Sequence, residues 1–331
     1  MTSDYRIVGS QESPHALKLR AYLQCKGLPY SWHSGAEARE LLQNHGQLPA
    51  LPLVLMPGQQ TLHDSTAIIK QIEARHSEPA MQPSDAVAGF MSLLLEEFGD
   101  EWGEKWVFHY RWAREADQLA STTRLAGIVE PGIEGAALDA AARKLRERLM
   151  DSAWFTHTPR QTAIALEASF KDTLALLEPH FAHRPFLFGA RPAFADFGLW
   201  GQLQSAHHDP TPRGIMEIHA PNTLGWLERM HKPSATGAFE SWETLANTLV
   251  PLVLDQVAGL FLPWSAANAR AVASGARNFS VTLRDELWDG QPQRHLARGL
   301  AVLKEAYQQS ARNPALNAAL ENTGALRWLA A

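Results

Sequence analysis

The sequence predicts an α/β domain followed by a mainly helical remainder, and three observations support this fold class. Short apolar segments of strand length alternate with helical patterns over residues 1–76. A polar segment punctuated by prolines, 77–84, then has the composition of a linker. Beyond it the patterns are helical, except at residues 278–283, which alternate like a strand. A chain of 331 residues is expected to form two or three domains.

Composition and charge exclude several functional classes. The net charge is −5 and no basic run occurs, so a nucleic-acid-binding protein is not expected. A single cysteine, Cys25, excludes an internal disulfide framework and a CxxC redox pair, and we interpret it as a small buried apolar residue. The N-terminus, Met1 to Asp4, carries an acid and no apolar signal core, which favours a cytoplasmic protein.

The first domain begins with a short strand at 5–9 and a helix that has clear end signals. The helix is predicted from Ser13 and Pro14 to Lys26, with Gly27 just past its end, as helix termini favour. The remaining elements are strand 29–33, helix 36–44, two short strands on either side of the turn 57–60, and helix 65–76. The order, βαβ and then ββα, is that of a thioredoxin-like layer of sheet and helices.

Two segments of this domain predict a binding site. Gln47-Leu48-Pro49-Ala50-Leu51 leads into an apolar strand through a proline, which cannot donate to the ladder. Asp64 and Ser65 open the following helix, where backbone N–H groups and the helix dipole favour a carboxylate. Together these segments indicate a site for a small, extended, anionic peptide.

These segments, read with Ser13-Pro14-His15-Ala16 at the first helix, resemble the cytosolic glutathione S-transferases. The serine before the proline is similar to the opening of the omega and Ser-type classes. The resemblance extends to about residue 230 and implies four parts. These are a thioredoxin-like glutathione-binding domain (1–76), a linker (77–84), an all-α C-terminal domain (85–232) and an extra mainly helical extension (233–331).

The resemblance implies a glutathione site formed by His45, Gln47, Leu48, Pro49, Asp64 and Ser65. The backbone of the residue before a cis-proline pairs with the cysteinyl part, which implies Leu48 before Pro49, with Pro52 as the alternative cis-proline. Asp64 and Ser65 would hold the γ-glutamyl end, and His45 and Gln47 the glycyl carboxylate. Asp64 is one methylene shorter than the Glu or Gln more usual there, and plain helix capping is the competing interpretation.

Ser13 is the catalytic candidate that the resemblance implies. Its hydroxyl would donate a hydrogen bond to the thiolate of glutathione and so raise the thiolate's share at neutral pH. Ser10 and Tyr5 are the alternative hydroxyls, and a simple N-cap is the structural interpretation of Ser13. Because no cysteine stands at this position, conjugation is favoured over thiol exchange.

The second domain is predicted to begin with one long helix from Asp85 to about Asp117, bent near Gly99 and Gly103. Further helices are expected over 136–152, 161–181, 194–206 and 222–231. In the family, a hydroxyl residue caps the helix that begins near residue 194.

Here Ala193 replaces that hydroxyl, a loss of about 1 kcal/mol, while Asp196 is retained. The sequence His207-His208-Asp209-Pro210 after this helix is interpreted as a turn.

The long helix carries charged rows and several aromatic residues. The charged residues fall into two rows at helical spacing: Glu96, Asp100 and Glu104, and Glu97, Glu101 and Lys105. We interpret them as a solvated or salt-bridged face, or as a charged face at the cleft between domains. No metal site is expected, because no ligand spacing is recognisable. Trp102, Trp106 and Tyr110 are candidates for a hydrophobic substrate pocket, with core packing as the alternative.

The most apolar segment, 249–262, lies in the extension. It contains Pro251, Asp255 and Gln256 and is shorter than the ~20 residues of a membrane span. A buried helix is therefore predicted, with no association with a membrane.

The resemblance implies an enzyme that binds glutathione as co-substrate and attacks a small hydrophobic electrophile with its thiolate. It also implies a homodimer formed through the long helix and the first domain. Two alternatives remain open. One is a non-catalytic binding or scaffold protein on the same fold, and the other is a glutathione-dependent dehalogenase or isomerase.

Overall fold

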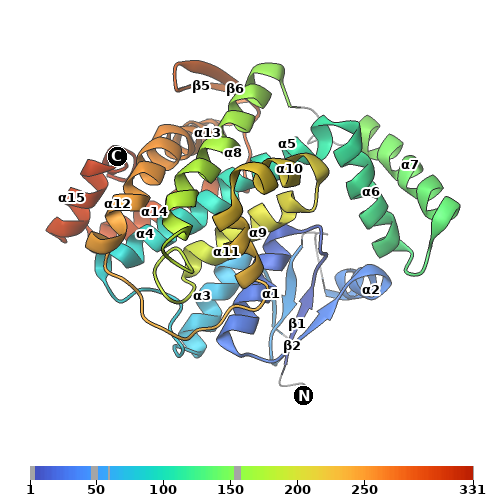
Figure 1. The fold of residues 1–331 in the computed structure, drawn as a ribbon, viewed down its shortest axis with the longest axis horizontal. Helices are drawn as coiled ribbons and strands as arrows, with labels where there is room; N and C mark the ends of the chain where they lie inside the picture. Colours follow the sequence, from blue (N-terminus) through green and yellow to red (C-terminus); the bar gives the residue numbers. More distant parts are fainter. Residues whose placement is uncertain (1–3, 46–50, 59, 153–157, 331) are drawn as a thin grey trace.

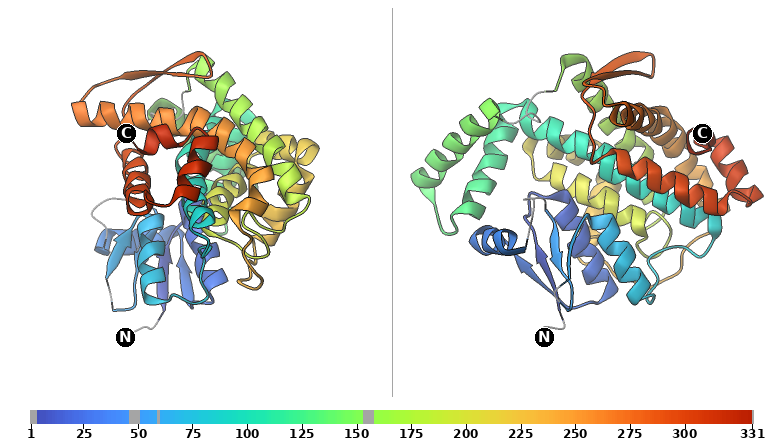
Figure 2. Two further views of the ribbon diagram at one scale, coloured as in Figure 1. Left: turned by 90° about the vertical axis from the view of Figure 1, so that its left-hand side faces the viewer. Right: turned by 180° about the vertical axis from the view of Figure 1, so that it is seen from behind.

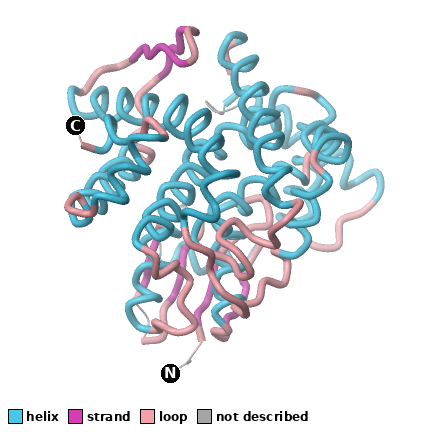
Figure 3. The backbone as a smooth tube through the Cα atoms, turned by 60° about the vertical axis from the view of Figure 1, so that its left-hand side comes forward, coloured by secondary structure: helices cyan, strands magenta, loops and turns pink. Residues whose placement is uncertain are grey.

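The computed structural model describes residues 4–45, 51–58, 60–152 and 158–330. A small α/β domain lies below a larger helical body in Figure 1, and the C-terminal extension runs along the side of that body away from α6 and α7. Figure 3 shows that nearly all strand structure is gathered near the N-terminus, apart from one hairpin at the opposite end of the molecule.

The N-terminal sheet has four strands in the order β2-β1-β3-β4. Strand β1 pairs parallel with β2 and antiparallel with β3, which pairs antiparallel with β4. The strands are Tyr5–Val8, Tyr30–His33, Leu53–Leu55 and Thr61–His63, and the helices are α1 (Pro14–Lys26), α2 (Gly35–His45) and α3 (Ser65–Arg75). The predicted order is therefore confirmed.

The two faces of this sheet bury different helices. Ile7 and Val54 belong to the main core together with residues of α1 and α3. Val8, Leu53 and Leu55 pack instead with Ala38 and Leu41 of α2 in a separate small cluster. The alternation along β1 and β3 thus places α1 and α3 on the face that meets the helical domain.

The long helix of the second domain is one continuous run with a π-helical segment inside it. It consists of α4 (Ala86–Glu97), η1 (Phe98–Trp102) and α5 (Gly103–Ala113). The bend predicted near Gly99 and Gly103 coincides with η1, where α9 crosses closely. A Cβ at Gly99 would lie 2.6 Å from the Leu199 nitrogen, and one at Gly103 2.8 Å from the Gln202 Cβ. Gly99 therefore lets the long helix approach the backbone of α9, and Gly103 makes room for the Gln202 side chain.

The predicted end of the long helix at Asp117 is wrong. Arg114 adopts an extended conformation, with φ −130° and ψ 142°, and ends the run at Ala113. A separate helix, α6 (Glu115–Val129), then begins, and it was not predicted.

In the part of the domain that the structure describes, the helices that follow are α7 (Gly135–Ser152), α8 (Arg160–Phe181), α9 (Phe194–His207), α10 (Pro210–His219) and α11 (Pro221–Arg229). Residues 195–206 of α9 are all buried, so this helix is the centre of the domain. Asp196 fixes its start, because its carboxylate accepts the N–H groups of Ala193 and Leu187, each at 2.9 Å. Ala193 has no side-chain hydroxyl that could accept the N–H of Asp196 in return, as the sequence indicated.

The extension contributes the elements that follow α11. They are α12 (Trp242–Leu252), η3 (Val253–Phe261), α13 (Leu262–Ser274), β5 (Phe279–Leu283), β6 (Glu286–Gly290), α14 (Ala297–Ser310), α15 (Pro314–Asn322) and α16 (Leu326–Leu329). The strand expected at 278–283 is present as β5, and it pairs antiparallel with β6, which was not predicted. Figure 2 shows α14 lying alongside α4, and both α14 and α15 contact that helix.

The apolar segment of the extension is part of a helical run, Trp242–Ser274, that is long and apolar enough to cross a membrane by length and composition. In its most apolar window 56% of the residues are buried within the chain itself. Leu249, Leu252 and Val253 are fully buried and belong to the main core. The predicted buried helix is therefore confirmed.

Candidate functional site

The turn before α1 carries two of the predicted hydroxyls. Ser13 is the N-cap of α1, and its Oγ accepts the N–H of Ala16 at 3.3 Å. Ser10 Oγ accepts the N–H of Glu12 at 3.1 Å. Since a hydroxyl that accepts one hydrogen bond still has a proton to donate, either group can serve a ligand at this turn.

Tyr5, the third candidate, lies elsewhere. Its side chain is buried, and its hydroxyl is 3.1 Å from Nε2 of His76, just past the C-terminal end of α3. Asp64 stands at the other end of that helix, about 16 Å away for eleven residues at 1.5 Å each. Tyr5 is therefore not at the same end of the domain as Asp64 and Ser65.

A buried ionic cluster that the sequence did not reveal holds the Ser10–Ser13 turn. Glu12 accepts a hydrogen bond from Arg124 Nε at 2.7 Å and lies 3.4 Å from Arg111 Nη2. Both arginines also pair with Asp209. Burial raises the pKa of Glu12, but the two arginines outweigh it and the pKa is lowered. The turn is thus tied by charge to α5, α6 and the start of α10.

The same cluster explains the motif after α9. Asp209 stands before α10, and its carboxylate binds the two arginines rather than acting as a turn cap. His208 Nδ1 lies 4.0 Å from Glu12, and burial lowers the His208 pKa to about 4. The histidine next to it, His207, is half-buried and burial lowers its pKa as well. The motif is structural.

Asp64 and Ser65 open α3 as predicted. Asp64 Oδ1 accepts the N–H groups of Thr66 at 3.1 Å and Ala67 at 3.2 Å, and Asp64 itself has a φ of 75°. The β3–β4 register pairs Leu53 with His63, so residues 51–52 precede β3 at the same end of the sheet at which Asp64 and Ser65 follow β4. A backbone edge and a helix N-terminus therefore meet at one corner of the sheet.

The remaining glutathione candidates fall largely outside the described residues. Gln47, Leu48 and Pro49 lie outside the described residues, and His45 is described only as the last residue of α2. The alternative proline, Pro52, follows a cis peptide bond.

The extension reaches this corner with an arginine. Arg298, on the first turn of α14, places Nη1 3.1 Å from Oδ2 of Asp64. The Arg298 side chain is 68% exposed and that of Asp64 40% exposed, so both groups remain open to a ligand. No sequence signal near Asp64 points to a residue so far along the chain.

In the first charged row of the long helix, Glu96 and Asp100 are buried and Glu104 is half-buried, which bears out the salt-bridged interpretation of this face and excludes the solvated one. Lys18 of α1 is inaccessible to solvent and its Nζ pairs with both Glu96 and Asp100. It also donates to Thr66 Oγ1 at 2.9 Å. Burial lowers the pKa of Lys18, but the two carboxylates outweigh it and raise the pKa. This contact joins the second turn of α1 and the first turn of α3 to the long helix.

The second row faces the extension. Glu101 Oε1 accepts the N–H of Gly299 at 3.1 Å, and a Cβ on Gly299 would lie 2.0 Å from that oxygen. A side chain at this position would require the Glu101 carboxylate to move. Burial raises the pKa of both Glu97 and Glu101 well above the usual range. These two carboxyls are therefore covered by α14.

Glu104 is flanked by two histidines. His15 Nε2 lies 3.7 Å from Oε1, and His295 Nε2 lies 3.5 Å from Oε2. Burial raises the Glu104 pKa, but the two histidines outweigh it and lower the pKa to about 2. Burial likewise lowers the pKa of His15, and Glu104 and Asp100 reverse this and raise it. Within the described part of the chain, no cluster of three or more His, Cys, Asp or Glu is arranged to hold a metal ion.

The aromatic residues predicted to line a pocket are core residues instead. Trp102, Trp106 and Tyr110 are completely buried. The indole Nε1 groups of Trp102 and Trp106 donate to Ser169 Oγ at 2.9 and 3.2 Å, and Tyr110 packs on Phe170. Core packing, the alternative interpretation of these residues, is therefore what the structure shows.

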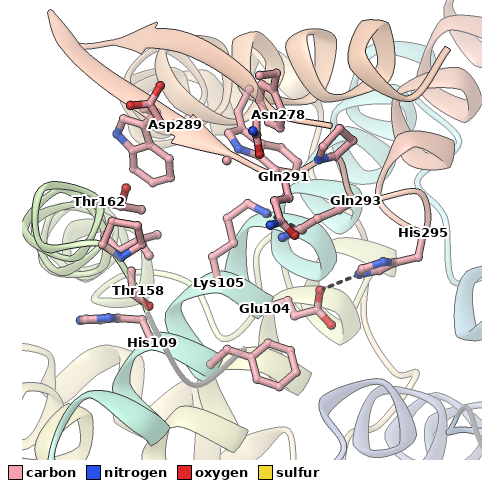
Figure 4. A pocket seen from close by; sticks show the side chains of 18 of the residues that line it. Glu104, Lys105, His109, Thr158, Thr162, Asn278, Asp289, Gln291, Gln293 and His295 are labelled. Atoms are coloured by element: carbon pink, nitrogen blue, oxygen red, sulfur yellow. Dashed lines mark hydrogen bonds and ion pairs between the residues drawn. The ribbon is translucent and has the colours of Figure 1, made fainter. Parts of the chain in front are cut away.

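A cavity of about 1070 Å³ lies on the neighbouring face of α5. Figure 4 shows its wall formed by α5, the start of α8 and the segment that follows β6. Among the residues that line it are Glu104, Lys105, Phe108, Trp264, Phe279 and Trp288. Because Glu104 also contacts His15, two residues after Ser13, the cavity adjoins the start of α1.

Two family models match the chain. One, described as the glutathione S-transferase N-terminal domain, matches residues 7–80, and the other, described as the C-terminal domain of the same family, matches residues 134–229. Together they match just over half of the chain. No curated protein matches.

Solved structures with a similar fold include three of interest. A glutathione S-transferase from Methylobacterium radiotolerans, in complex with glutathione sulfonate, is 19% identical, with 74% of this chain and 94% of that chain covered and a TM-score of 0.45. The beta-etherase LigF from Sphingobium sp. is 17% identical, with 71% and 97% covered and a TM-score of 0.48. A Tau class transferase from mango, Mangifera indica, is 17% identical, with 75% and 97% covered and a TM-score of 0.42.

Proposed function

The chain belongs to the glutathione S-transferase family, and from this premise we propose that it is a cytoplasmic enzyme that binds glutathione and activates its thiol. One observation carries the proposal. Lys18, five residues after Ser13, donates to Thr66, the residue after Ser65. The start of α1 and the start of α3 therefore lie together, and the positive dipole ends of both helices would favour an anionic peptide between them.

The γ-glutamyl end of glutathione carries an ammonium and a carboxylate on one carbon. In our proposal the ammonium pairs with Asp64, and the carboxylate lies on the N-terminus of α3 at Ser65 and against Arg298. An acid and a base 3.1 Å apart match the two charges of an amino acid. In the proposal, the backbone of residues 51–52, at the end of the sheet where Asp64 and Ser65 follow β4, would bind the cysteinyl part.

The thiol of glutathione would then lie at the Ser10–Ser13 turn. The Ser13 hydroxyl donates a hydrogen bond to the thiolate, and the positive dipole end at the N-terminus of α1 stabilises the thiolate further. The thiol proton leaves to solvent, and the sulfur lone pair forms a bond to the electrophilic carbon. In a substitution the electrons of the broken bond depart with the leaving group, and in an addition they move to the neighbouring atom, which is then protonated.

The cavity next to α5 is the proposed site of the electrophile. It adjoins the start of α1 through His15 and Glu104, and it is lined by aromatic rings. A cavity of this size suits a small hydrophobic molecule.

Oligomeric state is the point on which our proposal departs from the expected homodimer. From Val87 to Gly103 every residue except Leu93 is buried in the single chain. Helices α14 and α15 lie on this part of the long helix. We propose that the extension occupies the face through which a second copy would have bound.

The test is a calorimetric titration of glutathione into the wild-type protein and into Ser65→Ala, with Ser84→Ala, in the exposed linker, as matched control. Saturable binding that weakens only in Ser65→Ala supports the site. Absence of binding to the folded wild type overturns the proposal. Binding without turnover of any aromatic electrophile in a test panel identifies a binding protein rather than an enzyme.

A further inference from the structure

The cavity beside α5 combines flat aromatic walls with a lysine. Phe108 comes from α5, Trp264 from α13, and Phe279 and Trp288 from the β5–β6 hairpin. Trp264 and Phe279 pack edge to face, with centroids 5.9 Å apart, and Trp288 stacks on Trp102 at 5.4 Å. These contacts hold the rings in place, so the walls suit a planar guest.

Lys105 projects into this cavity (Figure 4). Its Nζ lies 3.4 Å from the centroid of the Trp264 ring, and its one hydrogen bond to a described residue is a long one, 3.4 Å, to Gln293 Oε1. Gln293 is itself held by Asn268 through bonds of 2.7 and 2.9 Å. The ammonium is thus positioned by an aromatic face and an amide rather than by an acid.

The nearby acids are engaged elsewhere. Glu104 lies between His15 and His295, and Glu101 accepts the N–H of Gly299. Asp289 of β6 accepts the hydroxyl of Ser280 at 2.5 Å. Among the residues that the structure describes, no carboxylate oxygen lies within 4.0 Å of Lys105 Nζ, although Glu104 and Glu101 act on it at longer range.

The Lys105 ammonium is buried without a carboxylate of a described residue in direct contact, so a negative charge placed beside it would stabilise its charged form. Burial lowers the Lys105 pKa to about 8, and the more distant Glu104 and Glu101 only partly oppose this effect. His109, the other basic residue deep in the wall, already binds Glu167 at 3.0 Å. Arg294 and His295 stand at the exposed rim. An anion that enters the cavity would therefore meet Lys105 as its main cation.

We infer that the cavity takes an aromatic carboxylate, whose ring lies among Trp264, Phe279 and Trp288 and whose carboxylate pairs with Lys105. This inference rests on the proposed function, because the glutathione thiolate would attack an electrophilic atom elsewhere on the same aromatic molecule while its carboxylate is held by Lys105. Binding would exchange a long contact with Gln293 for a charge-assisted one.

The test uses 1-naphthoate and its neutral analogue 1-naphthamide as probes, with binding followed by quenching of tryptophan fluorescence in the full chain without glutathione. The acid is expected to bind the wild type about tenfold more tightly than the amide. Lys105→Met is expected to remove this preference, and Lys105→Arg to retain it. Lys171→Met, the same change on the exposed side of α8, serves as matched control and is expected to behave as wild type.

Equal binding of acid and amide by the wild type overturns the inference, as does a preference that survives in a folded Lys105→Met. The outcome is separable from that of the proposed function. Glutathione that binds while naphthoate shows no preference refutes the inference alone. Naphthoate that binds through Lys105 while glutathione does not bind refutes the transferase proposal and leaves the aromatic carboxylate site.

Discussion

Arg298 and Asp64 form an ion pair between the first turn of α14 and the cap of α3, with Nη1 3.1 Å from Oδ2, although 234 positions separate them in the sequence. Both side chains are largely exposed, so the pair itself contributes little to stability. The ion pair is important for its position, because it brings a basic residue of the extension to the corner of the sheet where the γ-glutamyl group is proposed to bind.

Replacing Arg298 by alanine is expected to weaken glutathione binding by about 3- to 10-fold, because one charge-assisted contact to the carboxylate is lost at an exposed position. Titration calorimetry measures the change. Arg312→Ala, an exposed arginine just past the end of α14, is the control and should bind as wild type. Equal affinity in the two variants would show that the extension does not contribute to the site.

Removing the Ser13 hydroxyl is expected to raise the pKa of bound glutathione by about one to two units, the equivalent of one hydrogen bond to a charged group. The thiolate absorbance of the complex, followed against pH, reports this value. Ser13→Gly is the variant of choice, because glycine caps a helix almost as well as serine and so preserves α1. A shift in Ser10→Ala instead would identify Ser10 as the donor.

Glu101 is expected to make the fold less stable as pH rises. Burial raises its pKa in the folded chain well above the ordinary value, so the folded state holds the proton longer than the unfolded state. Its contribution is complete below the ordinary pKa of about 4.3 and declines, by up to about 1.4 kcal/mol per pH unit, until the raised value is reached.

Glu101→Gln keeps an oxygen for the Gly299 N–H and removes the titration. Urea unfolding at pH 5 and pH 9 should show the variant gaining stability over wild type at the higher pH. Glu321→Gln, at an exposed site on α15, should show no such gain. A constant difference between wild type and Glu101→Gln at both pH values would contradict the assignment.

Light scattering after gel filtration is expected to give the mass of one chain, 36.6 kDa. The reason is that α14 and α15 already cover α4. Twice that mass would mean that a second copy binds through another surface, or that the extension is displaced.

The parts of the fold that were predicted correctly have local causes. Helix α1 begins and ends where Ser13, Pro14 and Gly27 indicate, and Gly27 has the left-handed φ of 70° that suits glycine. The helix break at Arg114 was missed because no glycine or proline marks it.

The candidate site was predicted less completely, because its charges depend on distant partners. Glu96 and Asp100 repel each other when only their helix is considered, and Lys18, 78 and 82 positions away, reverses that conclusion. The hydrogen-bond donor to the Glu101 carboxylate is the N–H of Gly299, 198 positions away in the sequence. Core packing of Trp102 depends on another distant partner, because the ring that stacks on it, Trp288, lies on β6, a strand that was not predicted.

The distance in sequence between Asp64 and Arg298 also sets an order for synthesis. At about 5–20 residues per second, a ribosome takes roughly 12–47 s to travel from one codon to the other. During that interval the N-terminal domain can fold, but Glu97 and Glu101 remain uncovered because α14 has not yet been synthesised. A nascent chain therefore cannot complete the corner at Asp64, or the cover over Glu97 and Glu101, until nearly all of it has been translated.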